Sequence, residues 1–272
     1  MQTQFRYCGY KDRLLALFLL RMPTALSIVE NEDGFAVASD SAYYDMDTGT
    51  MSGYIDKIFP VDRNDLSIAY CLCGIVTFAA TDKQGKQPSV FNLLTEVPNV
   101  LSTVDKRATF RQFADEFGKR ICTKLRKATK LTPAKKSTET HVFLFGYHNG
   151  LPGLEIVAIR RNADSLDFEV FPGNAPHNVV TACFPGAVRD HLYDDPIFDR
   201  FLAKASPHSG IQKALEIARQ SVLACYDHAV RAKYPEANVV GGPIHTATIT
   251  AMGFRWIEHA QAEYNNEPSD IL

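Results

Sequence analysis

The stretch TALSIVENEDGFAVASDSAYYDMDTGTMSGYIDKIFPVDRNDLSIAYCLCG, residues 24–74, decides the fold of this 272-residue chain. It alternates short apolar runs with turn signals, and Asp33-Gly34 separates the first two runs. An Asp-Gly pair in this position predicts a β-hairpin, because tight hairpin turns need positive φ angles that glycine adopts easily. Two further strands are expected at residues 54–59 and 66–73, so the chain opens as a series of strands.

Helical periodicity follows these strands. Phe110, Phe113, Phe117, Ile121 and Leu125 recur every three or four residues, which predicts a helix with one buried face. A shorter helix is expected within residues 90–101, and further strands are expected at 141–145, 154–160, 166–171 and 179–183. A second helical stretch includes apolar residues between 214 and 225 and ends before Pro235, and a closing hairpin is expected over 245–258. Helices that stand between groups of hairpin-linked strands predict an α+β fold rather than a doubly wound parallel sheet.

The composition is that of an ordinary globular protein. Hydrophobic residues make up 46% and charged residues 22%, and the net charge of -2 argues against a nucleic-acid partner. The six cysteines stand in apolar segments without paired CxxC arms, which favours reduced thiols in a cytoplasmic protein. We interpret Cys71, Cys73, His141 and His245 as strand residues and expect no metal site and no cofactor, since HxH and HExxH patterns are absent from the sequence.

The chain is expected to hold one domain, residues 24–260, between an N-terminal extension or propeptide (1–23) and a C-terminal tail (261–272). The apolar run at residues 14–20 is too short to span a bilayer, so no membrane association is expected. A secretory signal, a propeptide and a true start at Met22 all remain open for this segment.

Residues 24–74 resemble the opening of a proteasome β-type subunit or bacterial proteasome-like peptidase, of the Ntn-hydrolase superfamily. Thr24 begins a short strand, the Asp33-Gly34 hairpin follows, Asp40 lies sixteen positions after Thr24, and Lys57 precedes an apolar strand. Residues 143–147 and 240–250 are similar to later strands of the family. The resemblance implies a four-layer αββα sandwich, with two mostly antiparallel sheets between helix layers.

The resemblance also implies roles for four residues. Thr24 would be the nucleophile, and its own freed α-amine would act as the base, because that amine has an ordinary pKa of about 7.7–8. Lys57 would favour the neutral amine, and Asp40 would orient Lys57. The backbone N–H of Gly74, placed just after the strand at 66–73, would stabilise the oxyanion.

The function implied is that of a threonine-type peptidase or amidohydrolase that acts on peptide or protein substrates. Self-association into a ring or stacked assembly is implied as well, without an organic cofactor or metal. An ATP-dependent partner stays open, since nothing in the sequence identifies one.

Several positions depart from the family pattern. Pro23 stands where the family has glycine, Pro185 replaces a supporting serine, and residues 237–242 lack the family's Asp and Ser, for which Glu236 or Ser221 could substitute. These departures favour an alternative, a catalytically silent subunit that serves assembly or binding. In the plain structural interpretation, Lys57 protects a strand edge and Asp40 occupies a turn.

Overall fold

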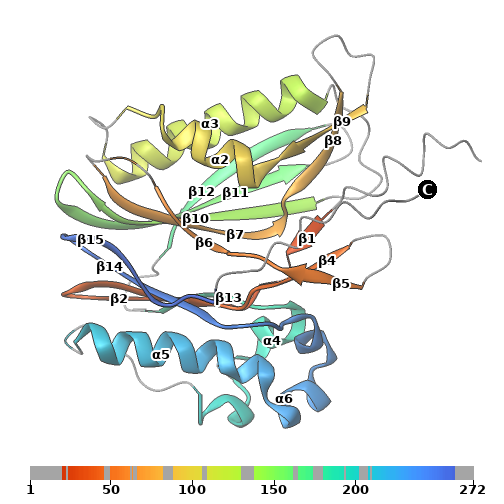
Figure 1. Cartoon of the computed structure of the whole chain (residues 1–272), viewed down its shortest axis with the longest axis vertical. Coiled ribbons are helices and arrows are strands. Elements are labelled where there is room, and N and C mark those ends of the chain that lie inside the picture. Colours follow the sequence, from red (N-terminus) through yellow and green to blue (C-terminus); the bar gives the residue numbers. More distant parts are fainter. Residues whose placement is uncertain are drawn as a thin grey trace, which may run out of the picture.

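The computed structural model describes residues 20–22, 24–45, 50–61, 63, 66–81, 88–105, 109–129, 138–161, 165–173, 180–192, 194–201, 208 and 210–260. The chain forms two large antiparallel sheets and one two-stranded ribbon, with helices packed on the sheets (Figure 1). The predicted α+β class is therefore confirmed. The described helices include none long and apolar enough to cross a membrane.

The larger sheet has the strand order β12-β11-β10-β7-β1-β4-β5, and β6 also pairs with β7. Its strands are β1 (Leu20–Met22), β4 (Ala42–Asp45), β5 (Met51–Tyr54), β6 (Ile58–Pro60), β7 (Ser67–Ile75), β10 (Thr138–His148), β11 (Leu151–Arg161) and β12 (Leu166–Pro172). The single strand expected at 54–59 is wrong: the chain forms β5 and β6 with a three-residue connection, 55–57, between them. That interruption matters because Lys57 lies in the connection.

The smaller sheet has the order β13-β2-β3-β14-β15. Its strands are β2 (Leu26–Asn31), β3 (Gly34–Ser39), β13 (Val180–Cys183), β14 (His245–Thr250) and β15 (Gly253–Glu258). The hairpin predicted near Asp33-Gly34 forms, with Asn31 opposite Gly34 in the register, so that Glu32 and Asp33 make the turn. Gly34 itself begins β3 at a φ of 144°, where a Cβ would lie 2.1 Å from the Ile249 carbonyl oxygen.

Two groups of helices cover the outer faces of the sheets. Figure 1 shows α2 (Leu93–Leu101) and α3 (Phe110–Thr129) on the larger sheet, beside the ribbon of β8 (Thr77–Thr81) and β9 (Pro88–Asn92). The smaller sheet carries α4 (Gly186–His191), η1 (Pro196–Phe198), α5 (Ile211–Leu223), η2 (Ala224–Tyr226), α6 (His228–Lys233) and η3 (Pro235–Val239). The helix predicted from the stripe at 110–125 is confirmed, because four of the five stripe residues are fully buried in α3.

Apolar side chains fill three separate clusters. One lies between α2, α3 and the larger sheet, and one lies between α5 and the smaller sheet. The third cluster lies between the two sheets and includes Leu26, Ile28, Phe35, Phe143 and Phe145. Polar groups gather in this same inter-sheet layer where β3 and β7 end, and they form the candidate site.

Candidate functional site

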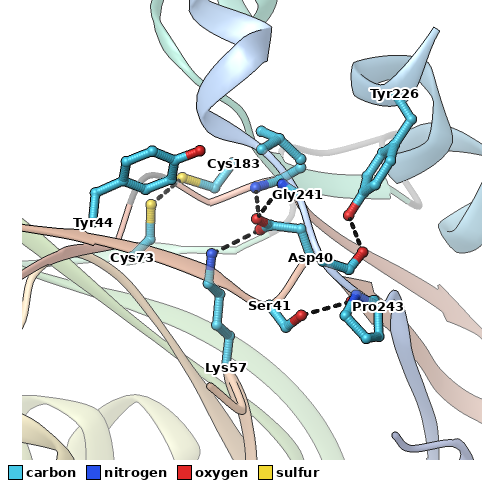
Figure 2. Close-up of polar contacts among 12 residues, drawn as sticks. Asp40, Ser41, Tyr44, Lys57, Cys73, Cys183, Tyr226, Gly241 and Pro243 are labelled. Atoms are coloured by element: carbon cyan, nitrogen blue, oxygen red, sulfur yellow. Dashed lines mark hydrogen bonds and ion pairs between the residues drawn. The ribbon is translucent and has the colours of Figure 1, made fainter. Parts of the chain in front are cut away.

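A buried ion pair connects the two sheets. Lys57 Nζ lies 2.8 Å from Asp40 Oδ1, and both side chains are fully shielded from solvent (Figure 2). Lys57 immediately precedes β6 of the larger sheet, and Asp40 immediately follows β3 of the smaller sheet. Removing either partner would leave an uncompensated charge in the interior, so each side chain fixes the position of the other.

Asp40 accepts hydrogen bonds from two backbone groups as well. Its Oδ1 accepts from the Ala25 N–H at 3.0 Å, its Oδ2 accepts from the Gly241 N–H at 3.2 Å, and its own N–H donates to the Ala25 carbonyl at 3.1 Å. Burial raises the pKa of the Asp40 carboxyl, while the Lys57 ammonium and the two N–H donors oppose that rise. The carboxylate thus holds three chain segments together.

Thr24 is buried, with 1% of its surface exposed, and directly precedes Ala25. The Ala25 N–H and the Lys57 ammonium both donate to Asp40 Oδ1. The ammonium therefore lies close to the peptide bond that joins Thr24 to Ala25. Asp40 and Lys57 are thus in direct contact, and Thr24 is the residue before Ala25, whose N–H binds the same Asp40 Oδ1. Pro23 lies outside the described residues.

Gly74 does not follow the strand as expected but lies within β7. It is opposite Met22 of β1 on one side and Thr140 of β10 on the other. Its φ is 105°, and a Cβ there would approach the Glu139 carbonyl oxygen to 2.5 Å. The backbone at this position therefore requires glycine, and the chain just upstream of Thr24 runs alongside it as a strand.

The segment 241–243 is tied to the residues after Asp40. The N–H groups of Ser41 and Ala42 donate to the Gly241 carbonyl at 3.2 and 3.0 Å. Ser41 Oγ donates to the Pro243 carbonyl at 2.9 Å, and the Tyr226 hydroxyl donates to the Gly242 carbonyl at 2.9 Å (Figure 2). These contacts hold the Gly241 N–H against Asp40. The sequence motifs did not indicate that Ser41 and the backbone of residues 241–243 would position Asp40 in this way.

The proposed substitute Ser221 does not take part in these contacts. Its hydroxyl donates to the Ile217 carbonyl at 2.9 Å, one turn earlier in α5. Pro185 is the residue that precedes α4, and Gly186 begins that helix at a φ of 34°. Ser221 is therefore occupied within its own helix.

The sequence analysis interprets Cys71 and Cys73 as packed strand residues, and both are buried in β7, but Cys73 also makes a polar contact. Cys73 Sγ lies 2.6 Å from Cys183 Sγ, and either atom can be the donor (Figure 2). The contact with Cys183, together with a hydrogen bond from His141 and the nearby Lys57 charge, lowers the pKa of Cys73 to about 5 despite its burial. His141 stands opposite Cys73 in the β7–β10 register, and its Nε2 is 2.7 Å from Glu139 Oε1. Sequence spacing could not show this cross-strand contact.

One further cluster has metal-ligand chemistry. Among the residues that the structure describes, the group formed by Asp56, His245 and His259 brings three potential ligand atoms within 4.8 Å of one another. His245 begins β14, as the strand interpretation of this residue expects. No ligand spacing in the sequence indicates this group, because the three residues come from distant segments.

Comparison with known proteins returns solved structures of similar size. Anbu (ancestral beta-subunit) from Yersinia bercovieri is 14% identical, with a TM-score of 0.49 over 86% of this chain and 87% of that chain. The Anbu (Gly-1) mutant from Hyphomicrobium sp. strain MC1 is 12% identical, with a TM-score of 0.49 over 90% of this chain and 89% of that chain. No family model and no curated protein matches the chain.

These findings correct the family expected from residues 24–74. The chain was predicted to be a proteasome β-type subunit or bacterial proteasome-like peptidase, and that prediction is wrong. Two of the matching structures are Anbu proteins at 12–14% identity, and no family model matches. The chemistry of the site must therefore be argued from its own residues.

Proposed function

We propose that this chain is a hydrolase of peptide or amide bonds, with Thr24 as an N-terminal nucleophile after removal of residues 1–23. The observation that supports it most strongly is the buried ion pair between Lys57 and Asp40. The Asp40 Oδ1 of this pair also accepts a hydrogen bond from the N–H of Ala25, the residue after Thr24. The proposal includes a single domain over residues 24–260, in a four-layer αββα arrangement of the Ntn-hydrolase type. Helices on the outer faces of two facing sheets support that arrangement.

The proposed reaction uses the freed α-amine of Thr24 as the base. The amine takes the proton of the Thr24 hydroxyl while Oγ attacks the carbonyl carbon, and it then protonates the leaving nitrogen as the C–N bond breaks. Water, deprotonated by the same amine, hydrolyses the resulting ester and restores the hydroxyl. Lys57 favours the neutral form of the amine by its positive charge, and Asp40 holds Lys57 in place.

The segment before Thr24 supports a role for processing. Residues 20–22 form β1, which pairs with β4 and with β7, where Met22 is opposite Gly74. In the proposal, this segment occupies the place of an extended substrate beside the Gly74 backbone, whose N–H is the proposed oxyanion donor. Cleavage after residue 23 would free the amine and open the larger sheet beside β7.

Intact mass and hydrolysis of model amide substrates test the proposal. A mature chain that begins at Thr24 should hydrolyse them, and Thr24→Ala should lower the rate by at least about 10³-fold. Thr24→Ser keeps a hydroxyl and should retain part of the activity, whereas Thr250→Ala, at the far end of β14, serves as the matched control. Hydrolysis by Thr24→Ala at the unsubstituted rate would exclude Thr24 as the nucleophile.

A second candidate is a catalytically silent protein that keeps the fold for binding or assembly. The observation that favours it is β1, which is built into the larger sheet between β4 and β7 and keeps Thr24 within the chain. This candidate predicts a stable full-length mass and no covalent labelling of Thr24 by an electrophile directed at N-terminal threonine. The first candidate predicts the opposite in both measurements.

Self-association belongs to the same proposal. The sheet-edge strands β5 and β15 expose large apolar side chains, among them Met51 and Tyr54 on β5 and Ile257 on β15. Exposed apolar residues on an edge strand favour pairing with a second copy. Sedimentation analysis should therefore show an oligomer that Met51→Lys weakens, and a monomer at all concentrations would contradict this part.

A further inference from the structure

Three side chains from distant segments meet beside the candidate site. Asp56 lies in the connection between β5 and β6, His245 begins β14, and His259 follows the last residue of β15. Asp56 Oδ1 is 3.1 Å from His245 Nδ1 and 3.0 Å from His259 Nε2. All three potential ligand atoms lie within 4.8 Å of one another.

The orientation of His245 carries the inference. This side chain is 1% exposed, and its Nδ1 pairs with Asp56 Oδ1 at 3.1 Å in a contact that lacks the alignment of a hydrogen bond, whereas His259 Nε2 is hydrogen-bonded to the same oxygen at 3.0 Å. A buried ring nitrogen normally has a partner, because leaving it without one costs free energy. A nitrogen and an oxygen that are close but not aligned with each other can both be directed at a third atom between them.

The spacing suits a metal ion as that third atom. Zinc–ligand distances are about 2.0–2.2 Å, so an ion bound to two atoms 3.0–3.1 Å apart would subtend an angle of roughly 95°. That angle lies between octahedral and tetrahedral values, and one ion can bind all three atoms when the two ring nitrogens come within about 4.2 Å of each other. Two imidazoles and one carboxylate form a ligand set that divalent transition metals accept, with other positions left for water.

Neighbouring groups hold the two imidazole rings in place. The Trp256 ring stacks on His259 with a centroid distance of 4.1 Å and meets His245 edge-on at 6.1 Å. The side chains of Asp56 and His259 are 34% and 25% exposed, so an ion can enter from solvent while His245 stays buried. The three residues therefore form a partly open site with a fixed inner ligand.

We propose that Asp56, His245 and His259 bind one divalent transition-metal ion of the zinc class. Asp56 immediately precedes Lys57, and His245 pairs with Ser39, which immediately precedes Asp40. A bound ion would thus tie together the two segments that carry the buried ion pair. The ion has a positioning and stabilising role, and the proposal does not depend on Thr24 being a nucleophile.

Metal binding by the purified full-length chain, first stripped with a chelator, tests this proposal. Zn(II) titration against a chromophoric chelator should give one equivalent bound with micromolar or tighter affinity. His259→Ala and Asp56→Asn should each weaken binding by more than about tenfold, since losing even an outer-shell partner of a metal costs 10- to 100-fold. His208→Ala is the matched control, because His208 lies 3.2 Å from Glu32 on the surface and is 82% exposed.

Co(II) spectroscopy separates this site from the cysteine pair. Binding by Asp56 and the two histidines should produce weak visible bands without the strong near-ultraviolet charge-transfer band that thiolate ligands give. The melting temperature should rise with Zn(II) in the parent chain and in His208→Ala, but not in His259→Ala. No binding at 100-fold excess of Zn(II), equal binding by His259→Ala, or a thiolate charge-transfer band would each overturn the assignment.

Discussion

The layer between the two sheets has an apolar part and a polar part, and the same strands supply both. Strand β3 contributes Phe35 to the apolar cluster and is followed by Asp40, while β7 contributes both Ala69 and Cys73 to that cluster, and Cys73 also contacts Cys183. Apolar burial stabilises the fold at about 25 cal/mol per Å² removed from water, whereas burying charges costs free energy unless they are paired. The contrast indicates that the apolar part holds the sheets together, whereas the polar part costs stability unless its charges stay paired.

Truncating a ring in the apolar part should have the largest effect on stability. Phe145 is fully buried and meets Phe35 edge-on with a centroid distance of 6.1 Å. Phe145→Ala should lower the free energy of unfolding by about 4 kcal/mol, because lost burial and a cavity both contribute. Denaturant titration measures this, with Leu151→Ala as the control, since Leu151 is 70% exposed on β11. A loss for Phe145→Ala as small as that of the control would contradict the assignment of the apolar part.

Breaking the buried ion pair should have the next largest effect. Lys57→Met keeps most of the side-chain volume but leaves the Asp40 carboxylate without its cation, which should cost about 3 kcal/mol at pH 7. The pKa of Asp40 should rise further in this variant. A carboxyl whose folded-state pKa is raised binds more protons when folded, so the variant should lose stability as pH rises above the ordinary Asp value.

The double variant Lys57→Met/Asp40→Asn separates the cost of an unpaired charge from the loss of packing. It should recover a large part of the lost stability, because no charge remains in the interior. A double variant as unstable as the sum of the two single variants would show that the two side chains act independently, contrary to the 2.8 Å contact.

Local patterns predicted most of the elements. The stripe from Phe110 to Leu125 forms α3, and the hairpins at residues 24–39 and 245–258 form because alternating apolar residues and tight turns act over a few positions. The resemblance of residues 24–74 to a known family implies that Asp40 and Lys57 meet, and the structure has them in contact. The family drawn from the same order was wrong, since short strands and turns are shared by many folds.

Contacts that depend on register between distant segments could not be predicted. Cys73 meets His141 through the pairing of β7 with β10, and His245 meets Asp56 only after the two sheets face each other. The expected strand over 54–59 failed for a related reason. Ile55 still donates its N–H to the Ser41 carbonyl, next to the Ala42–Tyr54 pair of the β4–β5 ladder, and the chain then leaves β4 so that β6 can pair with β7.

A smaller effect, which spectroscopy can detect, is expected from the contact between Cys73 and Cys183 in the inter-sheet layer. The pKa of Cys73 is lowered to about 5. Thiolate absorption near 240 nm should therefore decrease as the pH is lowered, with a midpoint near pH 5. The lowered pKa stabilises the fold at high pH, and this contribution should be lost as pH falls from about 9 towards 5. Cys73→Ser should abolish the transition, whereas Cys225→Ser should keep it, because burial raises the pKa of the Cys225 thiol. A transition that persists in Cys73→Ser would assign the thiolate elsewhere.

The smallest effect is expected from an ion pair of the same length on the surface. Lys124 Nζ lies 2.8 Å from Glu96 Oε2, the distance that separates Lys57 from Asp40, but these side chains are 49% and 28% exposed. Lys124→Met should lower the free energy of unfolding by about 0–1 kcal/mol, and 1 M salt should remove most of that difference, because the screening length is then about 3 Å. Lys57→Met should keep its larger loss in the same salt, because solvent ions do not reach a pair without exposed surface. Equal losses for the two Lys→Met variants would mean that distance rather than burial sets the strength of the pair at Asp40.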